Sequence, residues 1–112
     1  MPDDNEILHG DAPDLSQNQI AILAETFRLL GDPSRLRIVL CCLDGPIPVS
    51  EIAERLDLSL SLVSHHLRLL RAARLVNGVR QSKQIFYGIA DHHVSHVLID
   101  MANHIVEDHH GD

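Results

Sequence analysis

The 112-residue chain has few aromatic residues and only two cysteines. It contains no tryptophan, one tyrosine and two phenylalanines, so aliphatic side chains must fill its core. It has no uninterrupted apolar run of 18 or more residues, so we expect no membrane span. Its acidic N-terminus lacks the basic segment of a secretory signal, and we therefore expect a cytoplasmic location. The length suits one domain with a modest core.

The two cysteines, Cys41 and Cys42, are adjacent in an apolar stretch. Neighbouring cysteines seldom pair with each other, and the chain has no third cysteine. We interpret both as small core residues. The alternative is a thiol site that senses oxidation or binds a thiophilic metal.

Sequence motifs of the common enzyme classes are also missing. There is no GxGxxG, P-loop, nucleophile elbow or HExxH, so we expect no enzyme activity. The net charge of −7 argues against indiscriminate nucleic-acid binding. Residues 49–84, however, carry six basic and three acidic side chains, while the rest of the chain has a net charge of −10. This segregation favours a single segment that faces nucleic acid.

Periodicity and breaker residues divide the chain into three parts. Residues 1–13 are predicted to be a disordered acidic arm, 14–108 one domain, and 109–112 a short tail containing His109 and His110. Within the domain we expect helices from 14 or 16 to 30, 33–43, 50–56, 60–73 and 91–108, and a hairpin of strands 75–81 and 84–89. The predicted fold is mainly α with a β-hairpin, namely a winged helix-turn-helix.

Four local signals support these boundaries. Asp14 or Ser16 is expected to cap the first helix, and Asp32 the second, with a proline at its first position. Ser50 is a candidate cap for the third helix. Asp57 occupies the tight turn before the fourth helix, where it tolerates a left-handed backbone.

The fourth helix is the predicted DNA-reading element. Its apolar side is predicted to enter the core through Leu62, Val63, Leu67, Leu70 and part of Leu69. Short polar and basic side chains on the other side suit a major groove and its phosphates. The expected DNA contacts are Ser61, Ser64, His65, Arg68 and Arg71, with Arg80 and Lys83 near the hairpin tip. The alternative is an ordinary amphipathic surface helix; a metal site at His65 and His66 is disfavoured, since adjacent helical residues diverge.

The last helix carries two stripes. The apolar stripe consists of Val94, Val97, Leu98, Met101 and Ile105. We expect this stripe and the apolar stripe of the first helix to form a two-fold dimer interface. The second stripe consists of metal-ligand residue types, namely His93, His96, Asp100, His104 and Glu107. It is either a solvated face or a metal site, and the high density of histidine favours the metal site.

The length of this helix limits how a metal can bind. His104 and Glu107 can hold one ion, and Asp91 and His93 another, but His93 and His104 are about 16 Å apart along one helix. Metal bonds of about 2 Å cannot span that distance. If all four residues bind together, a second copy of the helix must run antiparallel to the first, which gives two equal sites.

These residues resemble the ArsR/SmtB family of metal-sensing repressors. The resemblance covers residues 20–108 and is carried by Leu-Leu-Gly-Asp-Pro-Ser-Arg-Leu-Arg-Ile (29–38), Val-Ser-His-His-Leu-Arg-Leu-Leu-Arg (63–71) and the hairpin ending in Phe86-Tyr87. One subgroup has Asp-x-His, ten residues, then His-x-x-Glu or His-x-x-His on its last helix. The resemblance therefore implies an intersubunit site of Asp91, His93, His104 and Glu107.

The same resemblance implies a repressor mechanism. The metal-free homodimer is expected to bind operator DNA and to release it when metal binds. His104 is expected to pass a hydrogen bond to a backbone carbonyl near Arg74, at the end of the recognition helix. The Cys-rich site of another subgroup is missing here, because Ile47-Pro48-Val49 stands in its place.

Two imidazoles and two carboxylates suit Zn²⁺ and tolerate Co²⁺. Ni²⁺ prefers more ligands, which His109, His110 or His9 would supply. Two rival functions stay open at this point. One is a repressor of the same fold that senses oxidation through Cys41 and Cys42, and the other is a His-rich metal buffer without specific DNA binding.

Overall fold

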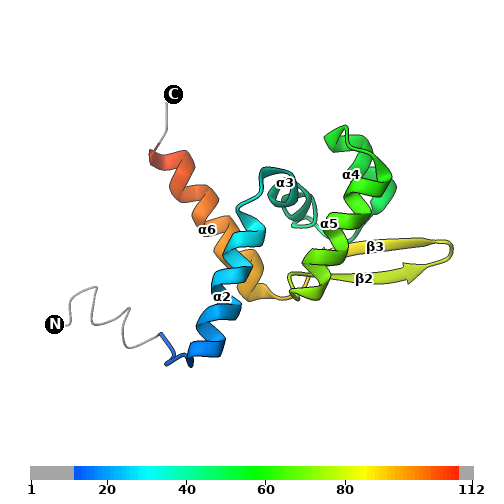
Figure 1. The fold of residues 1–112 in the computed structure, drawn as a ribbon. Coiled ribbons are helices and arrows are strands. Elements are labelled where there is room, and N and C mark those ends of the chain that lie inside the picture. The colour runs from blue at the N-terminus through cyan, green and yellow to red at the C-terminus, as the bar shows by residue number, and fades with distance from the viewer. Residues whose placement is uncertain (1–11, 109–112) are drawn as a thin grey trace.

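The computed structural model describes residues 12–108 (Figure 1). In chain order the elements are α2 (Gln17–Leu30), α3 (Pro33–Cys41), β1 (Ile47–Pro48), α4 (Val49–Leu56), α5 (Leu60–Ala72), β2 (Val76–Gln81), β3 (Gln84–Ile89) and α6 (His92–Asp108). The predicted order of helices, hairpin and final helix is therefore confirmed. Within the described range, no helix has the length and apolar character needed to cross a membrane.

Side-chain caps set the starts of α2 and α3. Ser16, one of the two predicted candidates, caps α2 in a reciprocal capping box with Gln19. The carboxylate of Asp32 accepts the backbone N–H of Arg35 at 2.9 Å, and this hydrogen bond is the main reason that the pKa of Asp32 is lowered. The end of α3 lies at Cys41, two residues before the predicted limit.

The helix-turn-helix consists of α4 and α5. The prediction that Ser50 caps α4 is wrong, because the helix already begins at Val49 and its N-cap, Pro48, has no side-chain hydrogen bond. Pro48 belongs to the short strand β1, which pairs with β3 and fixes the entry to α4. The prediction for Asp57 is confirmed, since its φ and ψ of 55° and 49° are left-handed.

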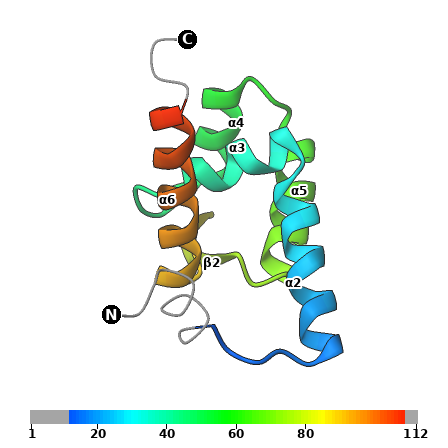
Figure 2. The same ribbon diagram turned by 90° about the vertical axis from the view of Figure 1, so that its left-hand side faces the viewer.

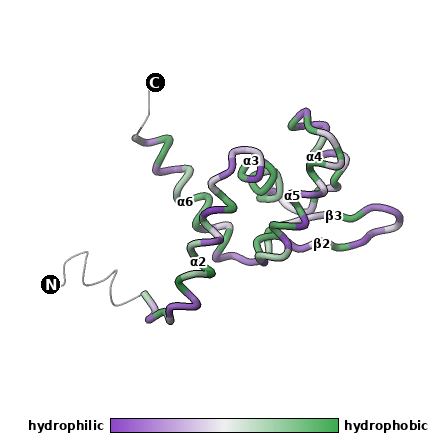
Figure 3. The backbone as a smooth tube through the Cα atoms, viewed as in Figure 1, coloured by the Kyte–Doolittle hydropathy of each residue, from purple (hydrophilic) through white to green (hydrophobic). Residues whose placement is uncertain are grey.

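The three strands form one antiparallel sheet in the order β1-β3-β2. The hairpin turns at Ser82 and Lys83, where Ser82 has a φ of 56°, and Gln81 pairs with Gln84. Gly78 lies opposite Tyr87, and a Cβ atom there would come within 2.9 Å of the tyrosine ring. The hairpin extends away from the helices (Figure 1), and its tip is hydrophilic (Figure 3).

The core lies between α3, α4, α5 and the base of the sheet. Its fully buried side chains are Ile38, Val39, Cys42, Ile52, Val63, Leu67, Leu70 and Val76. The prediction that Leu62 belongs to the core is wrong, because its side chain is 38% exposed. The buried stripe of α5 runs instead through positions 63, 66, 67 and 70, and Leu62 lies about 100° to one side of position 63.

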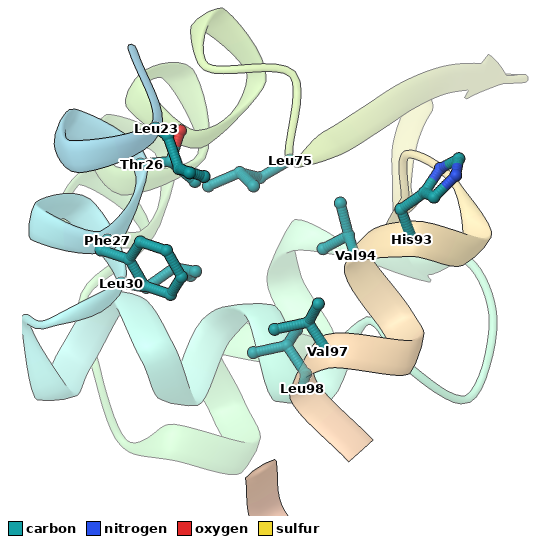
Figure 4. A pocket seen from close by; sticks show the side chains of 9 residues that line it. All are labelled: Leu23, Thr26, Phe27, Leu30, Leu75, His93, Val94, Val97 and Leu98. Carbon is teal, nitrogen blue, oxygen red and sulfur yellow. The ribbon is translucent and has the colours of Figure 1, made fainter. Parts of the chain in front are cut away.

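Helices α2 and α6 lie at the end of the molecule away from the hairpin (Figures 1 and 2). An apolar cleft separates them, with Leu23 and Phe27 of α2 on one side and Val94 and Val97 of α6 on the other (Figure 4). Phe27 is 57% exposed. Both helices therefore present apolar side chains that the rest of residues 12–108 does not cover.

Candidate metal centre and DNA-binding surface

The residues predicted to contact DNA are all exposed. The N-terminal part of α5 and the hairpin border one groove, in which Ser64 of α5 lies opposite Arg80 and Lys83 of the hairpin. Ser50 and Gln84 also line this groove, although neither was among the predicted DNA contacts. The position of Gln84 beside the predicted turn was the available signal.

The basic side chains of this surface form no ion pairs within residues 12–108. Among residues 12–108, the arginines that form ion pairs are Arg28 with Glu25 and Arg55 with Glu51. Arg68, Arg71 and Arg80 are in none of these pairs, so their charges are available to phosphate groups.

Asp91 and His93 lie together at the start of α6, directly after β3. Oδ1 of Asp91 accepts the backbone N–H groups of His93 at 2.9 Å and Val94 at 3.2 Å, so Asp91 caps α6. Nδ1 of His93 is 3.4 Å from the same oxygen. The hydrogen bond from Val94 is the main cause of the lowered pKa of Asp91, which keeps this carboxylate ionised.

His104 and Glu107 are exposed on the same helix, eleven and fourteen residues beyond His93. In residues 12–108 of a single chain, no three His, Cys, Asp or Glu side chains gather closely enough to hold a metal ion. One chain thus brings the four predicted ligands together only in part, as Asp91 with His93. His9, His109 and His110, the predicted extra ligands, lie outside the described residues.

Comparisons with known proteins identify the family of this chain. Residues 32–78 match the family model described as "Bacterial regulatory protein, arsR family". The chain is 38% identical over 93 residues to a transcriptional repressor SmtB homolog from Synechocystis, covering 83% of this chain and 70% of the relative. It is 39% identical to the transcriptional regulator NmtR of Mycobacterium tuberculosis, covering 80% of this chain and 75% of the relative.

The chain belongs to the arsR family of bacterial regulatory proteins. As a family member it is a transcriptional regulator and not an enzyme. Its fold matches that of a homodimeric winged helix-turn-helix DNA-binding domain from Mycobacterium bovis, a possible ArsR-family regulator, with a TM-score of 0.73 and 24% identity over 90% of this chain and 99% of the other.

The cysteines of this ArsR-family chain have the environment expected of core residues. Cys42 is fully buried, and burial raises the pKa of its thiol to about 12. Burial is also the main cause of the raised pKa of Cys41, which is half-buried. Both groups are therefore protonated thiols near neutral pH, and a thiol is a poor nucleophile and a poor metal ligand.

One histidine of α5 is buried, which the sequence analysis did not predict. His66 of α5 is 8% exposed, and its Nδ1 has no hydrogen-bond partner in the described part of the chain. Burial lowers the pKa of this imidazole, while the carboxylate of Asp32 opposes the shift, so His66 packs as a neutral core residue. The signal was its place in the buried stripe of α5, three residues after Val63.

Proposed function

We propose that this chain is a metal-responsive transcriptional repressor. Its metal-free homodimer binds operator DNA through α5 and the hairpin. A divalent transition metal ion, zinc in the first place, binds Asp91 and His93 of one protomer together with His104 and Glu107 of the other, and the dimer then releases the DNA.

The observation that carries this proposal is the distribution of the four ligands along α6. At one end of the helix, Nδ1 of His93 lies 3.4 Å from Oδ1 of Asp91. Near the other end, His104 and Glu107 are one turn apart. An antiparallel partner helix brings the two half-sites together twice, as two-fold symmetry requires.

The donor atoms fit zinc. Two imidazole nitrogens and two carboxylate oxygens make a closed set of four ligands, which suits Zn²⁺ and also accepts Co²⁺. Asp91 has a carboxylate oxygen, Oδ2, that is not used in capping α6, so metal binding and helix capping are compatible. Ni²⁺ would need further ligands, for which the tail residues His109 and His110 are the candidates.

The homodimer is supported by the uncovered apolar faces of α2 and α6. Phe27, Met101 and Ile105 are each more than half exposed. A similar winged helix-turn-helix domain is homodimeric. Dimer formation would also set the two α5 helices at the fixed spacing that two operator half-sites need.

A metal titration of the DNA-bound dimer tests the proposal. Fluorescently labelled DNA from upstream of the gene is bound by metal-free protein, and Zn²⁺, Co²⁺ and Ni²⁺ are added in parallel while anisotropy is followed. We expect release by zinc at the lowest free concentration. Cys41→Ser/Cys42→Ala should respond like wild type, whereas His93→Ala/His104→Ala should stay bound at the same zinc concentrations.

Two outcomes would contradict the proposal. If the metal-free protein shows no preference for any upstream sequence over random DNA, the chain is a metal buffer rather than a repressor. If the double cysteine variant alone loses its response, the effector acts through the thiols.

A further inference from the structure

The stripe of metal-ligand residues on α6 contains two members that the proposed sites do not use. His96 and Asp100 are exposed and lie between His93 and His104 in the sequence. At about 100° per residue they fall within a sector of about 80° that also contains His93, His104 and Glu107, whereas Asp91 precedes the first residue of α6. Any partner helix that meets the proposed ligands therefore also meets His96 and Asp100.

The proposed pairing fixes where these two residues stand. If Asp91 faces Glu107 of the partner and His93 faces His104 of the partner, the two-fold axis crosses α6 near Ile99. At 1.5 Å per residue, Asp100 is about 1.5 Å and His96 about 4.5 Å from this axis along the helix, on opposite sides of it. His96 of one protomer then differs from Asp100 of the other by only about 3 Å in height.

Such an arrangement gathers two imidazoles and two carboxylates at the centre of the α6 pair. The two Asp100 carboxylates would also come close to each other across the axis, and like charges in contact raise the energy of the dimer. A cation on the axis removes this repulsion and finds four donors of the types that zinc prefers.

We propose that His96 and Asp100 of both protomers form a third, central metal site on the two-fold axis, for zinc or a similar divalent transition metal ion. This inference rests on the antiparallel pairing of α6 in the proposed function. The central site lies about 10 Å from each outer site along the helix. It would therefore hold a separate ion, and His96 and Asp100 would not be extra ligands of the outer ions. A single chain cannot build it, which agrees with the lack of any three-ligand cluster within residues 12–108.

A competing arrangement exists within one chain. The rings of His92 and His96 are 5.7 Å apart between centroids, and residues four apart on a helix can share an ion. This arrangement would add one ion per protomer, whereas the central site adds one ion per dimer. Its second ligand is His92 rather than Asp100, so stoichiometry and substitutions separate the two.

The test counts metal ions on the full-length dimer. All variants carry His109→Ala/His110→Ala, so that the tail adds no ligands. Protein is equilibrated with Zn²⁺, passed through a desalting column and assayed for zinc, and the Co²⁺ form is followed by its visible absorption. We expect three ions per dimer in this parent, two in Asp100→Asn and in His96→Ala, one in His93→Ala/His104→Ala, and three in His92→Ala.

The outcomes distinguish this inference from the proposed function. Two ions in the parent, or no loss in either Asp100→Asn or His96→Ala, would overturn the central site and leave the outer pair intact. A loss in His92→Ala without one in Asp100→Asn would assign the extra ion to a single chain and equally overturn the central site. No loss in His93→Ala/His104→Ala would instead refute the outer sites, and the pairing on which the central site depends.

Discussion

Asp91 has two tasks in the proposed mechanism, since it caps α6 and contributes a metal ligand. Its Oδ1 accepts two backbone N–H groups, which leaves Oδ2 for the ion. Asn caps helices about as well as Asp, but it lacks the anionic oxygen, and Ala lacks both properties. The two tasks can therefore be separated by substitution.

We predict that Asp91→Asn weakens zinc binding and leaves the denaturant midpoint of the metal-free protein unchanged. Asp91→Ala should weaken zinc binding and also lower that midpoint, because the first N–H groups of α6 lose their acceptor. Both should still respond in part at saturating zinc, through the three remaining ligands. Chelator competition and urea unfolding measure the two effects. Equal denaturant midpoints for Asp91→Asn and Asp91→Ala would show that the cap contributes nothing to the stability of the metal-free protein.

The second residue-scale prediction concerns Cys42. A serine hydroxyl at this fully buried position would lack a partner, so Cys42→Ser should lower the free energy of unfolding by about 1–3 kcal/mol. Cys41→Ser, at the half-buried neighbouring position, should lower the free energy of unfolding by less. Urea unfolding at pH 7 compares them. Zinc-induced DNA release should survive in both.

The raised pKa of Cys42 also sets the sign of a pH effect. The unfolded thiol loses its proton near pH 9, whereas the folded thiol holds it to about pH 12. Burial of the neutral thiol therefore contributes its full stability below about pH 9 and progressively less as the pH rises from there towards 12. Cys42→Ala should remove this part of the alkaline decline in the unfolding midpoint.

At the scale of elements, α5 and the hairpin should contribute to DNA binding in different ways. Arg80 and Lys83 at the hairpin are expected to contact phosphates. Arg80→Ala should thus weaken all DNA sequences alike and reduce the salt slope of binding by about one unit. Ser64→Ala, at the N-terminal part of α5, should instead reduce the preference for operator over random DNA. Anisotropy at several salt concentrations measures both quantities.

A matched control for this prediction is Arg28→Ala. Arg28 lies on α2, away from the hairpin, and forms an ion pair with Glu25. Its removal changes the net charge of the chain as much as Arg80→Ala does, so any effect of overall charge should appear in both. If Arg80→Ala changes the salt slope of DNA binding no more than Arg28→Ala does, Arg80 of the hairpin does not contact DNA.

The sequence predicts the elements where local chemistry decides them. Asp32 with the following proline, the left-handed Asp57 and the polar turn at Ser82 are strong local signals, and each lies where expected. Prediction failed where a distant contact decides the outcome. The helix α4 begins directly after Pro48, which pairs with Phe86 of β3, 38 residues away, and no local pattern around Ser50 contains that information.

The candidate site divides in the same way. A helical period suffices to place Asp91, His93, His104 and Glu107 on one helix and to show that one copy cannot close the site. The sequence alone does not show that Arg80 and Lys83 lie beside Ser64. That placement depends on how the hairpin packs against α5 in the folded chain. The prediction also left His66 out of the core, because it is a polar residue, although it lies in the apolar stripe of α5 and is buried.

For the molecule as a whole, the dimer should not depend on metal. We predict that metal-free protein sediments as a dimer at micromolar concentration and that Phe27→Asp shifts it towards monomer, because a carboxylate would be buried in the α2 and α6 interface. Val79→Asp is the matched control, since Val79 on β2 is 55% exposed and Phe27 57% exposed. A metal-free wild type that is monomeric would contradict the interface.

The last prediction concerns the coupling between the proposed metal site on α6 and the DNA surface of α5 and the hairpin. A metal-bound imidazole usually donates its other N–H to a carbonyl or carboxylate, and the resemblance to the family assigns this role to His104, towards the backbone near Arg74. A coupling of about 3 kcal/mol would lower operator affinity about 150-fold. Operator DNA must then weaken zinc binding by the same factor.

His104→Gln tests whether this route carries the coupling. The amide can still offer its oxygen to zinc, but its N–H group is oriented differently from the second ring N–H of an imidazole, and we expect it not to reach the carbonyl. We expect zinc binding that is weaker, yet unaffected by the presence of operator DNA, and DNA binding that zinc at saturation no longer weakens. Asp91→Asn is the control, because it also weakens zinc binding but keeps His104, and it should retain most of the coupling at saturation. If saturating zinc releases His104→Gln from DNA as fully as it releases wild type, another residue transmits the signal even though the metal site itself is correct.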